Sequence, residues 1–167
     1  MTDRYGALSA MVQNASGYAK ECLDHFYQYF ESDALVIDKW FGLQASRQPE
    51  LNNSSSILQD VIQLRNHPDF HIKNPNRARS LIHAFCMNNP GAFHQADGKS
   101  YQFWAQQVVE LNEINPQVAA RLARALDRWK QFSPSYQIHM KSALKFVSDH
   151  KNLSSDVAEV INKALNS

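Results

Sequence analysis

Two stretches of this chain, Asn74–Arg79 and Asn115–Arg121, share one beginning: an asparagine, then a proline, then an arginine little more than a turn further on. The asparagine side chain can accept a hydrogen bond from a free amide of a first helical turn, and proline lacks the amide that would be unpaired there. Helices are therefore predicted to start at Pro75 and Pro116. The two starts lie 41 residues apart, a spacing typical of stacked helix-pair repeats.

Composition agrees with a helical fold. The chain has 167 residues, 44% of them hydrophobic, and only 5 glycines, too few for an all-β protein rich in turns. Its length is that of one domain with a sizeable core. We therefore predict an all-α fold: a helical superhelix of antiparallel helix pairs, an α-solenoid of the HEAT-like kind with about nine helices, forming a single domain over residues 1–167.

Apolar residues recur at helical spacing along most of the chain. Polar and turn-forming residues predict loops over 46–54 and 89–100, and Ser133-Pro134 offers a third start of the cap-then-proline kind. Ile62 is expected to be buried. The predicted helices cover residues 3–13, 17–31, 33–45, 55–66, 75–88, 100–113, a segment from Pro116, 134–149 and 155–166.

Charge and hydropathy limit the partners. The net charge is +1, with −4 over residues 1–71 and +4 over residues 72–130. This basic segment is less dense than the stripe that binds nucleic acid, so no nucleic-acid partner is expected. No apolar run reaches the 18 residues that a membrane span requires, and the N-terminus lacks the apolar stretch of a signal peptide. A cytoplasmic chain, or a piece of a larger cytoplasmic protein, is expected.

Motifs for chemistry are missing from the sequence. No HExxH, GxSxG, P-loop or glycine-rich dinucleotide turn occurs. His67 and His71 have a spacing that suits a metal on a helix, but Pro68 between them argues against that helix. Cys22 and Cys86 fall in apolar helical patterns and are expected to be reduced thiols in the core. We therefore predict no catalytic residue, no metal ligand and no cofactor in this chain.

One basic face is the candidate binding feature. On a helical wheel, Gln117, Arg121, Arg124 and Arg128 fall on one side of the predicted helix from Pro116, and Arg79 flanks the apolar stripe of the helix from Pro75. The simplest interpretation is a solvated polar face. The functional interpretation is a pair of cations that hold an anion such as a peptide carboxylate, for which the planar guanidinium fork is suited.

These residues lie in a sequence that resembles the C-terminal domain of bacterial aminopeptidase N, a zinc metalloaminopeptidase of the gluzincin type. The similarity extends from about Met1 to Leu165. The runs that carry it are Val36-Ile37-Asp38-Lys39-Trp40-Phe41, Asn74-Pro75-Asn76-Arg77 with Arg79-Ser80-Leu81-Ile82, Asn89-Pro90-Gly91-Ala92-Phe93-His94, Asp97-Gly98, and Asn115-Pro116-Gln117-Val118-Ala119.

The resemblance implies a role within a larger enzyme that removes N-terminal residues from peptides. The zinc and the catalytic residues would lie in a separate catalytic domain of the same parent chain. The helical domain would close over the active-site chamber, and two of its arginines would face the cavity and meet the distal end of a peptide substrate. They match Arg79 and Arg121, with Gln117 as a neighbour one turn before Arg121. The isolated chain is then expected to be inactive.

A different class of function stays open on the residues alone. A free-standing scaffold of helical repeats would bind a protein partner through the same kind of surface. It would be favoured if this chain were a complete gene product. An HExxH motif some hundreds of residues upstream of Met1 would favour the aminopeptidase.

Overall fold

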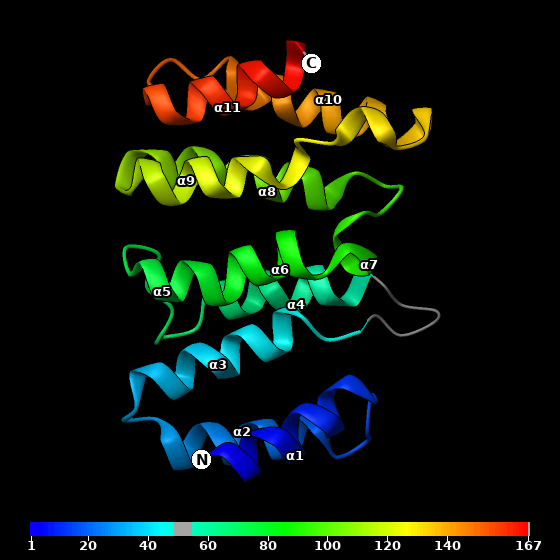
Figure 1. The fold of residues 1–167 in the computed structure, drawn as a ribbon. Helices are drawn as coiled ribbons and strands as arrows, with labels where there is room; N and C mark the ends of the chain where they lie inside the picture. Colours follow the sequence, from blue (N-terminus) through cyan, green and yellow to red (C-terminus); the bar gives the residue numbers. More distant parts are fainter. Residues whose placement is uncertain (49–54, 167) are drawn as a thin grey trace. The chain divides into compact units, whose positions relative to one another are not determined.

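The structure, a computed structural model, describes residues 1–48 and 55–166. These residues form two compact units, coloured along the chain in Figure 1. Unit 1 contains Met1–His71 and Asn76–Ala92, and unit 2 contains Ile72–Pro75 and Phe93–Ser167. Every regular element of the described residues is helical, so the predicted all-α class is confirmed.

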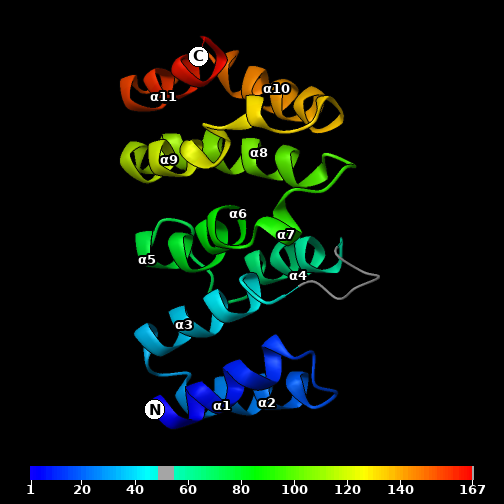
Figure 2. The ribbon, with the colours of Figure 1, turned by 45° about the vertical axis from the view of Figure 1, so that its right-hand side comes forward.

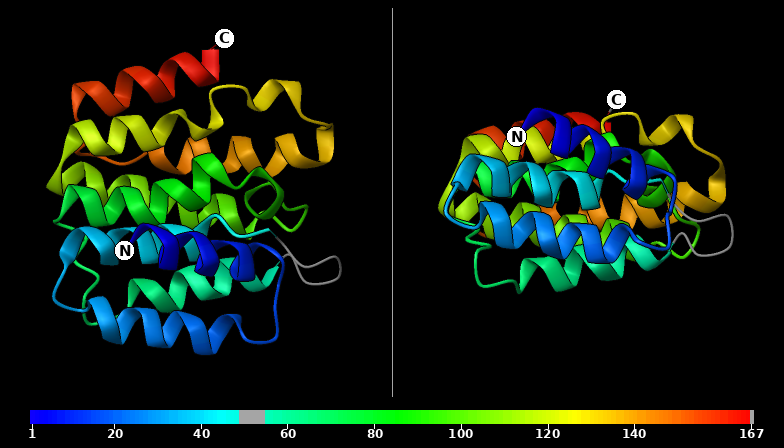
Figure 3. Two further views of the ribbon diagram at one scale, coloured as in Figure 1. Left: turned by 60° about the horizontal axis from the view of Figure 1, so that its bottom comes forward. Right: turned by 90° about the horizontal axis from the view of Figure 1, so that it is seen from below.

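Unit 1 is built from helices that fold back on one another. In chain order they are α1 (Thr2–Gln13), α2 (Ala19–Phe30), α3 (Ala34–Ala45), α4 (Ser55–Arg65), α5 (Pro75–Ala78), the π-helical turn η1 (Arg79–His83), α6 (Ala84–Asn88) and α7 (Pro90–Phe93). Consecutive helices from α1 to α4 pack against each other, and η1 lies against α3. Figure 3 shows this succession from two further sides.

Unit 2 repeats the helix-pair pattern. Its elements are α8 (Lys99–Ile114), α9 (Pro116–Ala123), the short 3-10 turns η2 (Arg124–Leu126) and η3 (Trp129–Gln131), α10 (Pro134–Ser148) and α11 (Ser155–Asn166). Helix α8 packs against α9 and α10, and α11 packs against the same two helices (Figure 2). Asn115 alone separates α8 from α9, which forces the two helices to run antiparallel.

Helix starts follow the sequence closely. Pro75 is the first residue of α5, as expected. At α9 the side chain of Asn115 accepts a hydrogen bond from the amide of Val118 at 3.2 Å, as its position before Pro116 predicts. Ser133 occupies the corresponding position before α10, but its side chain makes no capping hydrogen bond there. A residue of the capping type thus marks where these helices begin, but its side chain does not always make the capping hydrogen bond.

Four details differ from the expectation. The helix predicted over 75–88 is continuous but carries the π turn of η1, and the helix predicted from Pro116 ends as an α-helix at Ala123. The predicted loop 89–100 contains the short helix α7. Ile62, expected in the core, is 43% exposed. Of the predicted loop 46–54, residues 49–54 lie outside the described residues.

Each of the three tryptophans links two helical elements. The indole N–H of each donates to a main-chain carbonyl oxygen on a neighbouring helix, so the ring is buried without leaving its polar group unpaired. The donor and acceptor pairs are Trp40 with Leu23 at 3.0 Å, Trp104 with Leu122 at 2.9 Å, and Trp129 with Ala164 at 2.8 Å.

Gly98 is a position in unit 2 where only glycine fits. Its φ of 71° lies in the left-handed region, and a Cβ atom there would stand 2.6 Å from Cγ of His139. We expect Gly98→Ala to lower the free energy of unfolding by about 1–2 kcal/mol from the backbone strain alone. Chemical denaturation measures this change.

The matched control is Gly6 in α1, where a Cβ atom would meet nothing within 4 Å. Gly6→Ala should raise the free energy of unfolding by about 0.5–1 kcal/mol, since alanine is the better helix former. Equal effects of the two substitutions would contradict this account of Gly98.

Candidate functional site: exposed arginines on two units

Arg79 is presented by unit 1 at the first position of the π turn. The amide of Ala84 donates to the carbonyl oxygen of Arg79, five residues earlier, which is the hydrogen bond that defines this turn. The Arg79 side chain is exposed. Within the described residues, its guanidinium takes part in no hydrogen bond or ion pair. Arg79 is therefore a cation available to an external anion.

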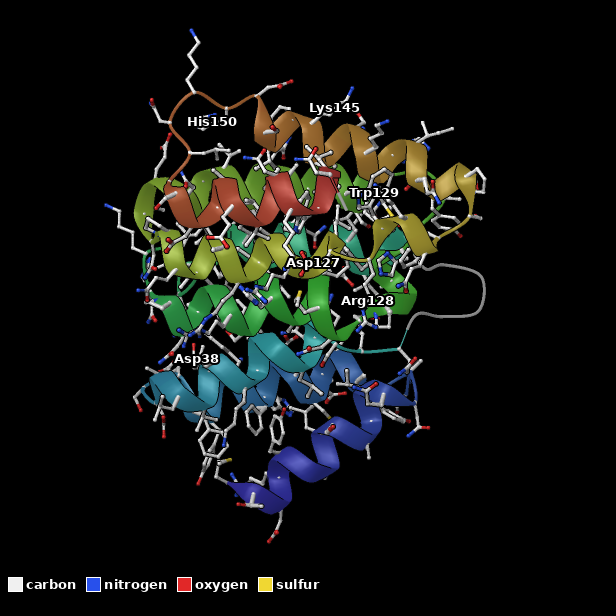
Figure 4. All side chains as sticks on the ribbon, turned by 45° about the horizontal axis from the view of Figure 1, so that its top comes forward. Asp38, Asp127, Arg128, Trp129, Lys145 and His150 are labelled. Carbon is white, nitrogen blue, oxygen red and sulfur yellow. The ribbon has the colours of Figure 1, made fainter. Side chains whose placement is uncertain are left out.

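Arg77, two residues earlier, is buried and has an acidic partner. Its side chain is 7% exposed, and its Nε lies 3.1 Å from Oδ1 of Asp38 on α3. The guanidinium also stands over the ring of Phe41, 5.0 Å from the centroid. Burial raises the pKa of Asp38, and the positive charge of Arg77 opposes that rise. Figure 4 labels Asp38 on α3.

This buried pair was not identified from the sequence. Two residues along a helix turn the side-chain direction by about 200°, so Arg77 and Arg79 must face opposite sides of one segment. The pattern around Asp38 carried a signal: this carboxylate lies in the segment Val36–Phe41, whose four apolar residues are buried. A carboxylate in such a place needs a cation nearby.

Gln117 and Arg121 are presented by α9 in unit 2. The core-facing side of this helix consists of Val118, Ala119, Leu122 and Ala123, all buried. Gln117 and Arg121 lie one turn apart on the exposed side, as the wheel predicts. The guanidinium of Arg121, like that of Arg79, has no hydrogen bond or ion pair among the described residues.

The two remaining arginines of the predicted face, Arg124 and Arg128, are exposed but lie beyond the end of the α-helix. The α-helix ends at Ala123, and Arg124 starts the tighter 3-10 turn η2, whose geometry breaks the 100° step. Arg128 falls in the turn before η3, next to Asp127 and Trp129 (Figure 4). Burial raises the pKa of Asp127, and the positive charges of Arg124 and Lys163 oppose that rise.

The predicted site residues therefore belong to both units. Gln117 and Arg121 share one helix face, and Arg79 stands on unit 1. That Arg79 and Arg121 line one recess stays a prediction. Each guanidinium offers a planar set of donors to a carboxylate or phosphate. Anion binding by these groups is therefore the prediction to be tested.

His67 and His71, whose spacing suits a metal site, have different surroundings. The ring of His67 packs against Tyr27, Trp40 and Phe41 at centroid distances of 5.1–5.6 Å. His71 is exposed. In the part of the chain that the structure describes, no three His, Cys, Asp or Glu side chains gather in a group suited to a metal ion. The donor set of these residues therefore does not fit a zinc ion.

Both cysteines are free thiols. Cys86 is buried, and burial raises its pKa well above the ordinary value. Cys22 is only partly buried, in a mainly apolar pocket of about 330 Å³ between α1 and α2, so its expected place in the core is not fully confirmed. The described helices include none with the length and apolar character that crossing a bilayer takes.

Comparison with known proteins supports the resemblance drawn from the sequence. The chain is 42% identical over 165 residues to aminopeptidase N of Haemophilus influenzae, and 40% identical over 165 residues to aminopeptidase N of Escherichia coli. Each match covers 99% of this chain and 18% of the relative. The chain thus spans less than a fifth of the length of these relatives.

A solved structure agrees. The crystal structure of Legionella pneumophila aminopeptidase A in complex with aspartic acid matches 99% of this chain and 19% of that chain, with a TM-score of 0.87 and 31% identity. Residues 1–166 match the family described as a domain of unknown function (DUF3458_C) with ARM repeats. The resemblance to the C-terminal domain of aminopeptidase N is confirmed, and the chain belongs to the DUF3458_C family of ARM-repeat domains.

Proposed function

We propose that this chain is a non-catalytic helical domain of a zinc aminopeptidase, where it holds the carboxylate end of a bound peptide through Arg79 and Arg121. The domain spans residues 1–167, and its partner is the catalytic domain of the same parent chain. The observation that carries the proposal is a pair of exposed guanidinium groups without partners among the described residues, in a chain whose relatives are aminopeptidases.

The zinc ion of this proposal belongs to the parent's catalytic domain. The donor set described here offers no ligand group for it, so we derive no step through zinc from these residues. The contribution of this domain is binding: it fixes the far end of the peptide while the scissile end meets the metal. Binding energy gained away from the reacting bond lowers KM, or raises kcat where it is used for orientation.

Arginine is the right residue for this task. It stays charged at every physiological pH and presents paired N–H groups that match both oxygens of a carboxylate. Lysine would keep the charge but lose the two-handed geometry. Gln117, one turn from Arg121, is placed to donate a neutral hydrogen bond to the same end of the peptide.

Kinetics of the full-length parent test the proposal. Arg79→Ala and Arg121→Ala should each raise KM for a tripeptide with a free carboxyl terminus by roughly tenfold or more, the loss of one charge-assisted hydrogen bond of about 1.5–3 kcal/mol. The same peptide with an amidated terminus should change by about twofold or less, because a neutral amide forms the weaker kind of hydrogen bond.

The control is Lys141→Ala, which removes an exposed positive charge from α10. If the effect of the arginines is not one of net charge alone, Lys141→Ala should leave KM unchanged for both the free and the amidated peptide. Equal increases for the free and the amidated peptide would reject carboxylate binding. The cytoplasmic location of the parent also stays a prediction, which cell fractionation tests.

A further inference from the structure

The π turn at Arg79 is an irregularity that needs a cause. The segment from Pro75 to Asn88 is α-helical on both sides of residues 79–83, and the wider turn is confined to those five residues. Such turns are rare and less favourable than the α-helix, so they persist where neighbouring structure holds them. Two elements from earlier in the chain pack against this turn, α3 and, less extensively, α4.

Gly42 brings α3 unusually close to the turn. A Cβ atom on Gly42 would lie 3.2 Å from the main-chain oxygen of Ser80, tighter than ordinary van der Waals contact. Gly42 lies inside α3, where glycine weakens a helix by about 0.5–1 kcal/mol relative to alanine. The close approach to Ser80 gives a physical reason for a glycine in this unfavourable place.

Asp38, one turn before Gly42 on α3, contacts the same segment. Its carboxylate binds the buried guanidinium of Arg77, which packs over Phe41 of the same helix. The hydroxyl of Ser80 in turn donates to the carbonyl oxygen of Arg77 at 3.0 Å. Residues 77 and 80 are thus both fixed against α3, and the exposed Arg79 lies between them.

We propose that α3 is the positioning element for Arg79: Asp38 and Gly42 fix the residues on either side of it, hold the π turn, and so set the direction of its guanidinium. This inference rests on the proposed function of Arg79 in anion binding. The residues of α3 touch no substrate in this proposal. They act through Arg79, as residues that fix a binding group must do to keep it in register with its ligand.

The structural half of the test uses the 167-residue chain. Gly42→Ala should shift the NMR signals of the Ser80 amide and the Arg79 Nε–H, and should speed hydrogen exchange of the Ala84 amide that closes the π turn. Gly6→Ala is the matched control, because it makes the same change in a helix with open space around it. Unchanged signals at Arg79 and Ser80 in a folded Gly42→Ala variant would overturn the inference.

The functional half uses the full-length parent. Gly42→Ala should raise KM for the free-acid tripeptide about threefold to tenfold, because displacements well below 1 Å already weaken a positioned contact. The amidated peptide and kcat should be unaffected. In an Arg79→Ala background, Gly42→Ala should change KM no further, because the group it positions is gone.

These experiments distinguish a failure of the positioning role of α3 from a failure of the proposed function of Arg79. An equal effect of Gly42→Ala with and without Arg79 would show that α3 acts by another route, and would overturn the positioning role. No effect of Arg79→Ala itself would reject the proposed function, and the NMR comparison would then decide by itself whether α3 directs Arg79. Asp38→Asn, which keeps the shape but leaves the buried Arg77 without its counter-ion, is a second variant: it should shift the same Arg79 and Ser80 signals and should also lower the free energy of unfolding.

Discussion

Replacing Arg77 with methionine should lower the free energy of unfolding at neutral pH by about 3 kcal/mol. The change keeps most of the side-chain volume but leaves the carboxylate of Asp38, whose side chain is 15% exposed, without its cation. Removing one partner of a buried ion pair is costly because the remaining charge has lost both water and its counter-ion. Urea denaturation of the two proteins measures the difference.

The pH dependence of that loss has a definite sign. Burial already raises the pKa of Asp38, and loss of Arg77 should raise it further. A carboxyl whose folded pKa lies above its unfolded value stabilises the fold below the unfolded pKa, and that contribution is lost as pH rises through the folded pKa. The loss in the free energy of unfolding caused by Arg77→Met should therefore be small near pH 4 and reach its full size at pH 7.

A double substitution separates charge from packing. Arg77→Met combined with Asp38→Leu removes both charges and should recover much of the lost stability, since apolar pairs often replace buried ion pairs without loss. A deficit in Arg77→Met that stays constant between pH 4 and pH 7 would contradict the role assigned to the Asp38 carboxylate.

Trp104→Ala should have the other large effect, a loss of about 4 kcal/mol in the free energy of unfolding. Trp104 is fully buried in α8, and its indole donates to the carbonyl oxygen of Leu122 near the end of α9. The substitution creates a cavity and also leaves that carbonyl oxygen without its donor. Calorimetry or urea denaturation gives the measurement.

The conservative change separates the two contributions. Trp104→Phe keeps an aromatic ring but removes the indole donor. It should therefore lower the free energy of unfolding by less than Trp104→Ala does, and should loosen mainly α9. Hydrogen exchange of the α9 amides should accelerate more than that of the α11 amides. Because Arg121 precedes Leu122, a loosened α9 also weakens the placement of Arg121. Identical stability of Trp104→Phe and the unchanged protein would contradict this account.

Sequence patterns predicted the features that depend on neighbouring residues. The cap of Asn115 on Val118 and the exposed face of Gln117 and Arg121 follow from spacing within a few residues. Ser133 shows the limit of such reasoning, since its hydroxyl lies 3.1 Å from that of Ser135 and makes no capping bond. A residue of the right type at a helix start has more than one hydrogen-bond partner within reach.

Features that depend on contacts between distant segments were missed. One example is the hydrogen bond from the indole of Trp129, in the segment after α9, to the carbonyl oxygen of Ala164 in α11, 35 residues away. The π turn at Arg79 is another, because it is set against α3, about 40 residues earlier in the chain. A helical wheel with a fixed step of 100° includes neither contact, so it extended the helix past Ala123 to Arg124 and Arg128.

The most direct test of the central claim is a crystal structure of the full-length parent with an uncleaved tripeptide bound. The account predicts the guanidinium groups of both Arg79 and Arg121 within about 3 Å of the peptide's terminal carboxylate oxygens, the distance of a charge-assisted hydrogen bond. It would be contradicted if the two arginines faced different outer surfaces of the protein, with the carboxylate held by other residues.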